Sequence, residues 1–128
     1  MLFSVKDIKL LQETEEININ IFESLREKIK SDDIWISPII IEKKSLAILD
    51  GHHRYNVAKD LILKRVPCFI VDYFDDRVIV SSWRPDIEIN KKLVLEYIYK
   101  NKKFMSKTTR HTFKVKIPES EIPLSLLF

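Results

Sequence analysis

The sequence predicts an α+β fold, a single domain over residues 1–128 in which a small mixed sheet is flanked by helices. Short apolar segments of strand character alternate with amphipathic helical segments in the order β-α-β-β-α-β-β-α-β. Hydrophobic residues make up 45% of the chain and charged residues 32%, which is typical of a globular protein with a core. A length of 128 residues fits one domain better than two.

The strands are predicted from short runs of apolar and β-branched residues. The run at 2–11 partly alternates between apolar and polar side chains. The segment 36–51 holds two apolar runs joined by a polar turn, which indicates a hairpin. The runs at 65–73 and 75–83 are rich in valine and isoleucine, and the stretch from His111 onward alternates until prolines interrupt it.

Three helices are predicted where apolar residues recur every three or four positions, the spacing of one helical face. This pattern covers 20–32, about 52–63, and 89–102. Asn18 or Asn20 can cap the start of the first of these helices.

The only glycine of the chain, Gly51, lies between a predicted strand that ends at Asp50 and a predicted helix. Glycine permits a sharp turn with positive φ, or a close approach of another group to the backbone. The first turn of a helix has unpaired N–H groups that attract anions, and Arg54 adds a charged donor there. His52 and His53 can donate hydrogen bonds or exchange protons. An anion site therefore competes with a plain turn in which Asp50 caps the helix and the histidines are solvated.

A second polar cluster lies far downstream, in a basic part of the chain. Five consecutive residues there can form hydrogen bonds: Lys107, Thr108, Thr109, Arg110 and His111. Alone, such a stretch is typical of a solvated basic loop. Together with the turn at Gly51, it can clamp one nucleotide from two sides. Trp83, at the end of a predicted strand, either packs in the core or forms part of the same site.

Several other classes of site and protein are disfavoured. The adjacent His52 and His53 are poorly placed to chelate zinc together, and the chain lacks the glycines of a Walker P-loop. Cys68, the single cysteine, excludes an intrachain disulfide and is predicted to be a buried apolar residue, so we expect a reducing cytoplasm. No run of about 18 apolar residues occurs, so we expect no membrane partner. A net charge of +3 argues against nucleic acid as a partner.

Three separated segments resemble the ParB/sulfiredoxin superfamily, and within it most closely the free serine kinases. These segments are DGHHRY at 50–55, SWRP at 82–85 and KTTRH at 107–111. A sulfiredoxin-like protein would need a cysteine at the position of His52. A ParB-type partition protein would need a downstream helix-turn-helix domain, which we do not expect within 128 residues.

The resemblance implies a ParB/sulfiredoxin-like fold and a kinase that uses ATP or ADP, with Mg²⁺, to convert free L-serine to O-phospho-L-serine. By resemblance, the nucleotide is bound by Gly51, His52, His53, Arg54, Lys107, Thr108, Thr109 and Arg110. The same resemblance assigns L-serine to Trp83, Thr109, Arg110 and His111. The resemblance also implies that Asp50 is catalytic and lies near the metal and the serine hydroxyl. The family also has a glutamate base near the N-terminus, for which Glu15 is the best match, followed by Glu16 and then Glu13.

Other functions remain open at this point. The main alternative is a non-catalytic ParB-like module that binds CTP or associates with DNA, and a prophage or toxin–antitoxin accessory protein would also keep the fold. A nuclease would need a cluster of carboxylates, whereas Asp50 has no close acidic neighbour in the sequence. The sequence does not distinguish ATP from ADP as donor, and a homo-oligomer is compatible with it.

Overall fold

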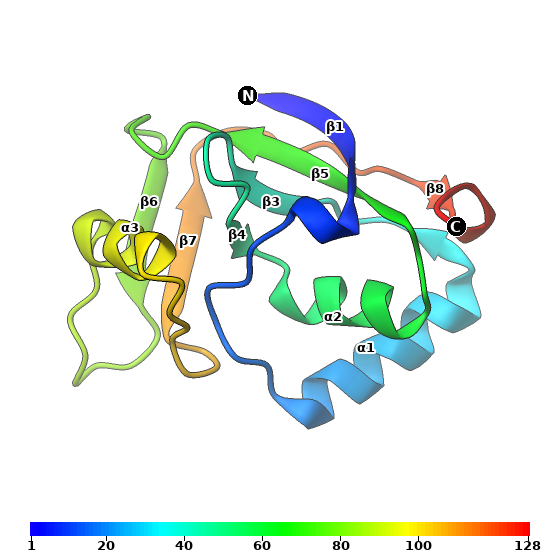
Figure 1. Ribbon diagram of the computed structural model, residues 1–128, viewed down its shortest axis with the longest axis horizontal. Helices are drawn as coiled ribbons and strands as arrows, with labels where there is room; N and C mark the ends of the chain where they lie inside the picture. Colours follow the sequence, from blue (N-terminus) through cyan, green and yellow to red (C-terminus); the bar gives the residue numbers. More distant parts are fainter.

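The computed structural model describes residues 1–128, and its centre is a four-stranded mixed sheet (Figure 1). The strand order is β1 (Leu2–Asp7), β5 (Arg65–Val71), β3 (Ile39–Glu42) and β4 (Ile48–Asp50). β3 runs parallel to β5, and the other two pairings are antiparallel. The predicted α+β class and the mixed sheet are therefore confirmed.

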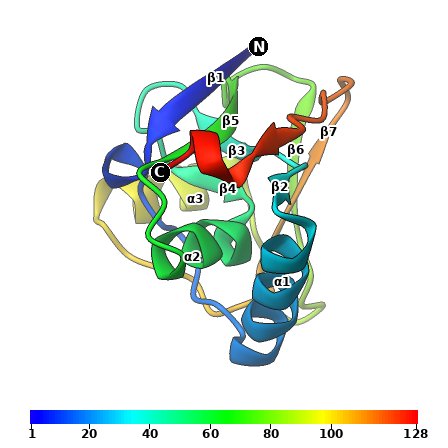
Figure 2. The same ribbon diagram turned by 90° about the vertical axis from the view of Figure 1, so that its right-hand side faces the viewer.

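Helices cover both faces of this sheet. α1 (Ile19–Asp32) and α2 (His52–Asp60) lie side by side on one face, and α3 (Lys91–Tyr99) packs on the other (Figures 1 and 2). Each face has its own apolar core. Ile39 and Ile41 point into the core under α1 and α2, whereas Ile40 points into the core under α3. Burial on both faces explains why β3 is apolar at consecutive positions.

A separate two-stranded sheet lies beside α3, formed by β6 (Val78–Ser82) and β7 (Thr109–Phe113), which α3 separates in the chain. The two strands are antiparallel, with Ser82 opposite Thr109. The basic stretch that the sequence suggested as a loop is thus partly a strand, because its last residues pair with β6. This pairing places Thr109 and the residues just before it next to the end of β6.

Two smaller features differ from the sequence-based expectation. The first predicted strand ends at Asp7, whose carboxylate caps a 3₁₀ turn at Ile8–Leu10 by accepting the Lys9 N–H at 2.9 Å. A two-residue strand, β2 (Ile34–Trp35), pairs with β8 (Ile122–Pro123), and a 3₁₀ turn at Leu124–Leu126 follows. Pairs this short carry no periodicity that a sequence pattern could reveal. None of the helices has the length and apolar character needed to cross a membrane.

Candidate active site

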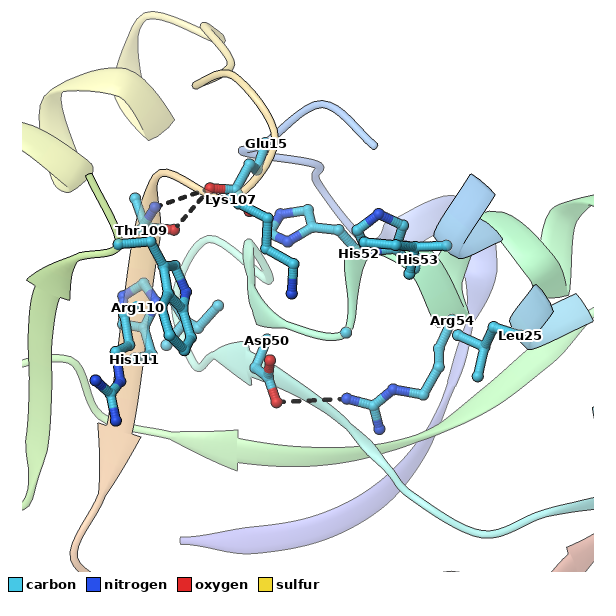
Figure 3. A pocket seen from close by; sticks show the side chains of 14 residues that line it. Glu15, Leu25, Asp50, His52, His53, Arg54, Lys107, Thr109, Arg110 and His111 are labelled. Atoms are coloured by element: carbon cyan, nitrogen blue, oxygen red, sulfur yellow. Dashed lines mark hydrogen bonds and ion pairs between the residues drawn. The ribbon is translucent and has the colours of Figure 1, made fainter. Parts of the chain in front are cut away.

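A cleft of about 220 Å³ opens between the N-terminus of α2 and the start of β7 (Figure 3). It is lined by eleven of the twelve residues assigned to the site from the sequence: Glu15, Asp50, Gly51, His52, His53, Arg54, Trp83, Lys107, Thr109, Arg110 and His111. The turn at Gly51 and the basic segment, distant in the chain, therefore share one cleft. A small ligand in this cleft would lie next to both segments.

The turn between β4 and α2 requires a glycine for both reasons considered from the sequence. Gly51 has φ +104°, a conformation that side chains disfavour. A Cβ at this position would lie 2.9 Å from Nη2 of Arg54 and 3.3 Å from Cγ1 of Ile39. The sharp turn thus lets the Arg54 guanidinium lie directly against the backbone at the mouth of the cleft.

The N-terminus of α2 faces the cleft without a side-chain cap. The first hydrogen bond of the helix runs from the Tyr55 N–H to the Gly51 carbonyl at 2.9 Å. The N–H groups of residues 52–54 consequently have no partner within the helix. Together with the partial positive charge of a helix N-terminus, they form a site suited to phosphate oxygens.

Arg54 is fixed by backbone oxygens as well as by a carboxylate. Its Nη1 donates to the carbonyls of Ser37 at 2.8 Å and Pro38 at 2.9 Å. Its Nη2 lies 3.4 Å from Oδ2 of Asp50. Burial lowers the pKa of Arg54 and the nearby Asp50 carboxylate opposes this effect. The guanidinium is thereby held in one orientation, with Nη2 on the side of the cleft.

The two histidines of the turn accept hydrogen bonds from the chain. Nε2 of the buried His52 accepts the Thr14 N–H at 3.2 Å, and Nε2 of His53 accepts the Asn18 N–H at 2.9 Å. Burial lowers the pKa of His52 to about 3 and also lowers the pKa of His53, on which the Lys107 charge acts in the same direction. The imidazoles therefore tie the N-terminal segment to α2, and the backbone N–H groups at these positions are what a phosphate can reach.

This burial predicts a dependence of stability on pH. His52 and His111 have pKa values lowered by burial to about 3 and about 4, below the ordinary 6.5 that they regain on unfolding. Between pH 6.5 and 4 the unfolded chain binds protons that the folded chain does not, so the free energy of unfolding falls as pH falls. Each histidine contributes a slope of about 1.4 kcal/mol per pH unit. Urea denaturation from pH 7 to 4.5 measures this slope.

A matched variant separates these histidines from other titrating groups. His52→Gln keeps an acceptor for the Thr14 N–H but cannot be protonated, so its slope should be smaller than that of the wild type by the contribution of one histidine. An unchanged slope in this variant would show that His52 is not buried in its neutral form.

Glu15 is the buried carboxylate of the cleft. Its Oε1 accepts the N–H groups of Thr108 and Thr109, both at 2.8 Å, and the Thr109 hydroxyl at 3.3 Å. Burial raises the pKa of Glu15, although these hydrogen bonds and the Lys107 charge act in the opposite direction. With Oε1 occupied by three donors, Oε2 remains as the oxygen that can accept a proton from a ligand.

The two competing glutamates are placed differently. Glu13 accepts from Nζ of Lys103 at 2.7 Å and from Nδ2 of Asn56 at 2.8 Å. Burial alone would raise the pKa of Glu13, but these partners outweigh it and the pKa is lowered. Glu16 is exposed, and neither Glu13 nor Glu16 lines the cleft. Of the three glutamates, Glu15 alone lines the cleft and is buried.

The opposite wall of the cleft is basic and aromatic. Trp83, of which 51% is exposed, has the Lys107 ammonium 5.7 Å and the Arg110 guanidinium 4.6 Å from its ring centre. Lys107 adopts a left-handed conformation with φ +57°, and its side chain extends into the cleft (Figure 3). This wall combines two positive charges with a flat apolar surface, which suits a ligand that has an anionic group beside a small apolar one.

Two residues of the basic segment have structural contacts as well. Thr108 does not line the cleft, because its hydroxyl donates to the Met105 carbonyl at 2.7 Å and only its N–H reaches Glu15. His111 lines the cleft, and its Nε2 lies 2.8 Å from the Tyr73 hydroxyl. Burial lowers the pKa of His111 to about 4. His111 thus presents a neutral ring to the cleft.

Sequence comparison finds similarity to L-serine kinases and to a ParB-like protein. The chain is 39% identical over 93 residues to an ATP-dependent L-serine kinase of Staphylothermus marinus, a match that covers 68% of this chain and 37% of that protein. It is 36% identical over 75 residues to a ParB-like protein of Sulfolobus acidocaldarius, covering 59% of this chain and 37% of that protein. The chain is related to the L-serine kinases. No family model matches it.

The fold is that of the free serine kinases. A solved free serine kinase in complex with AMP superposes with a TM-score of 0.88 at 16% identity, covering 98% of this chain and 93% of that one. A conserved hypothetical protein of Pyrococcus furiosus superposes with a TM-score of 0.91 at 16% identity, covering 100% and 98% of the two chains. The sequence matches, by contrast, span little more than a third of the length of the curated relatives.

Three further residues that the sequence patterns did not mark also line the cleft, namely Ile21, Leu25 and Leu49. Ile21 and Leu25 belong to α1, where their spacing is that of an ordinary apolar helix face. Leu25 also lines a smaller pocket between α1 and β2, and Arg54 lines both spaces. No motif marks these positions, because an apolar residue that lines a cleft has the same pattern as one that fills a core.

Proposed function

We propose that this protein transfers the terminal phosphoryl group of ATP or ADP to the hydroxyl of free L-serine, giving O-phospho-L-serine. The observation that carries the proposal is that two carboxylates, Glu15 and Asp50, line one cleft whose other charged groups are cationic. Phosphoryl transfer needs positioned cations for the phosphates and a group that takes the hydroxyl proton. Relatives named as L-serine kinases include one named for ATP as donor and one named for ADP.

The nucleotide phosphates are assigned to the N-terminus of α2. The free N–H groups of residues 52–54 and Nη2 of Arg54 act from one side, and the Lys107 ammonium acts from the other. The nucleoside extends toward the pocket between α1 and β2, whose apolar wall includes Leu25. In this pose the terminal phosphoryl group lies between Asp50 and Glu15.

The proton of the serine hydroxyl passes to Oε2 of Glu15. As the hydroxyl oxygen forms its bond to phosphorus, the bond from phosphorus to the bridging oxygen of the nucleotide breaks, and that oxygen leaves with the bond electrons. Burial raises the pKa of Glu15, which makes the carboxylate a better proton acceptor than an exposed glutamate. The Thr108 and Thr109 N–H groups hold Oε1 and thereby orient Oε2 toward the acceptor hydroxyl.

The amino and carboxyl groups of serine are assigned to the wall at the start of β7. Arg110 offers a guanidinium for the carboxylate, and the Trp83 ring covers the carbon chain. The Thr109 hydroxyl and the neutral His111 ring complete this wall.

Magnesium fits the donor set of the cleft. The Asp50 side chain is 57% exposed, and its one charged partner within the chain is Arg54 at 3.4 Å. No three His, Cys, Asp or Glu side chains cluster as a complete metal site. Mg²⁺ commonly uses one or two carboxylates together with substrate phosphates, so Asp50 with the nucleotide phosphates suffices. When bound, the ion neutralises charge on the phosphates.

The decisive experiment incubates the purified protein with L-serine, Mg²⁺ and one nucleotide at a time, and detects O-phosphoserine by mass spectrometry. Product with ATP or ADP supports the kinase and identifies the donor. Tight binding of CTP without product would instead favour the ParB-like nucleotide-binding alternative. A folded protein that makes no product with either ATP or ADP would overturn the proposal.

Asp50→Asn is expected to lower kcat by about 10²–10³-fold, because removal of one preorganised charge at a developing transition state has an effect of that order. The amide keeps the size of the side chain, so the melting temperature should remain that of the wild type. An Mg²⁺ titration of the activity measures whether the variant needs more metal. Asp76→Asn, on an exposed loop outside the cleft, is the matched control. Equal turnover in Asp50→Asn and Asp76→Asn would remove Asp50 from the site.

A further inference from the structure

Residues 82–84 form hydrogen bonds to the turn that carries Lys107. Of these three residues, only Trp83 has a role in the proposed mechanism. The Trp83 N–H donates to the Thr108 carbonyl at 3.0 Å. Nη2 of Arg84 donates to the Ser106 carbonyl at 2.8 Å. The backbone of Arg84 is bonded to the Ser82 hydroxyl, which accepts the Arg84 N–H at 3.0 Å and donates to the Arg84 carbonyl at 2.8 Å. Two successive residues of this segment thus bind the carbonyls that flank Lys107.

The conformation of this turn matters for both sides of the cleft. Lys107 has φ +57°, which a residue with a side chain adopts only where its surroundings impose it. The next two N–H groups, of Thr108 and Thr109, both point at Oε1 of Glu15. A change in the turn would therefore redirect the Lys107 ammonium and release the Glu15 carboxylate together.

Arg84 is poorly explained as a residue that only adds stability. Its Nε is buried and has no hydrogen-bond partner, and the same is true of the Ser106 hydroxyl oxygen. A buried donor without a partner lowers stability relative to an apolar group of similar shape. The one hydrogen bond that Arg84 makes across the chain is to the turn, so its contribution is the geometry of that turn.

We propose that Arg84 is a positioning residue of the cleft. Through the Ser106 carbonyl it keeps the turn at 105–108 in the conformation that places the Lys107 ammonium in the cleft and presents two N–H groups to Glu15. The expected effect of Arg84 on turnover rests on the proposed kinase function. The expected effect of Arg84 on the conformation of the turn does not depend on that function.

The test compares Arg84→Met with Arg84→Lys. Methionine fills the space without a donor, so ADP affinity by calorimetry and kcat should each fall about tenfold, the effect of one lost hydrogen bond to a charged group. The melting temperature should stay within about 3 °C of the wild type, because an unsatisfied donor has been removed as well. Lysine restores a donor for the Ser106 carbonyl and should bring both quantities back to within about threefold. Arg77→Met, an exposed arginine paired with Asp75 at the other end of β6, is the matched control and should match the wild type.

Tryptophan fluorescence gives a readout that needs no catalysis. Trp35 is 1% exposed and Trp83 is 51% exposed, so acrylamide quenching reports on Trp83. Loosening of the turn should increase this quenching in Arg84→Met and not in Arg77→Met. The proposal is overturned if Arg84→Met keeps wild-type quenching and ADP affinity, or if it loses stability in parallel and lysine rescues nothing. If the wild type makes no phosphoserine but Arg84→Met still shows increased quenching, the positioning role stands and the kinase assignment fails.

Discussion

Glu15→Gln should abolish most of the phosphoryl transfer while leaving the fold intact. The amide oxygen of glutamine can still accept the three donors that now bind Oε1, from Thr108 and Thr109. The amide nitrogen in place of Oε2 cannot take the serine proton. Loss of a general base typically lowers kcat by about 10²–10⁴-fold. Steady-state kinetics should therefore show a large fall in kcat with little change in nucleotide affinity.

Two neighbouring glutamates supply controls for this result. Glu16→Gln changes an exposed carboxylate outside the cleft and should leave kcat unchanged. Glu13→Gln weakens the contact with Lys103 and should affect stability more than turnover. If Glu15→Gln retained near-normal kcat while Glu16→Gln or Glu13→Gln lost it, the base would have to be reassigned to that residue.

Gly51→Ala should remove nucleotide binding and destabilise the protein. The backbone at Gly51 has φ +104°, and the new Cβ would lie 2.9 Å from Nη2 of Arg54. Arg54 cannot move aside without breaking its hydrogen bonds to the carbonyls of Ser37 and Pro38. Strain of this kind is worth about 1–3 kcal/mol, so we expect a loss of that order in the free energy of unfolding. Urea denaturation and an ADP titration measure the two effects.

The control for this substitution lies on the same helix. Lys59→Ala changes an exposed side chain in the last turn of α2, and it should keep wild-type ADP affinity and nearly wild-type stability. A Gly51→Ala protein with unchanged stability and unchanged ADP affinity would show that neither the positive φ nor the contact with Arg54 matters.

Much of the fold could be predicted because its elements have local signatures. The apolar periodicity of α1 and the continuous apolar run of β5 can each be recognised within a few residues of sequence. The start of β7 at Thr109 could not be predicted, since this polar segment becomes a strand only by pairing with Ser82 and its neighbours on β6. The pairs of two residues, such as β2 with β8, are too short for any periodicity.

The candidate site divides in the same way. The motif from Asp50 to Arg54 predicted a turn with an anion site, and the structure has the turn, the positive φ and the free helix N-terminus there. The use of the histidine rings was not visible, because the groups they accept from, Thr14 and Asn18, lie 35 or more residues away.

The sequence by itself is sufficient to predict the features that depend on residues close together in the chain. These are the glycine turn, the apolar faces of the helices, the apolar runs of the strands and the composition of the two polar segments. Three-dimensional packing decided that Glu15 is buried in the cleft while Glu16 is exposed, and it brought the Glu15 carboxylate to N–H groups 93 and 94 positions away. Backbone preferences extend over one or two turns of chain, whereas the burial, charge and hydrogen bonds of a carboxylate depend on whichever residues the folded chain places around it.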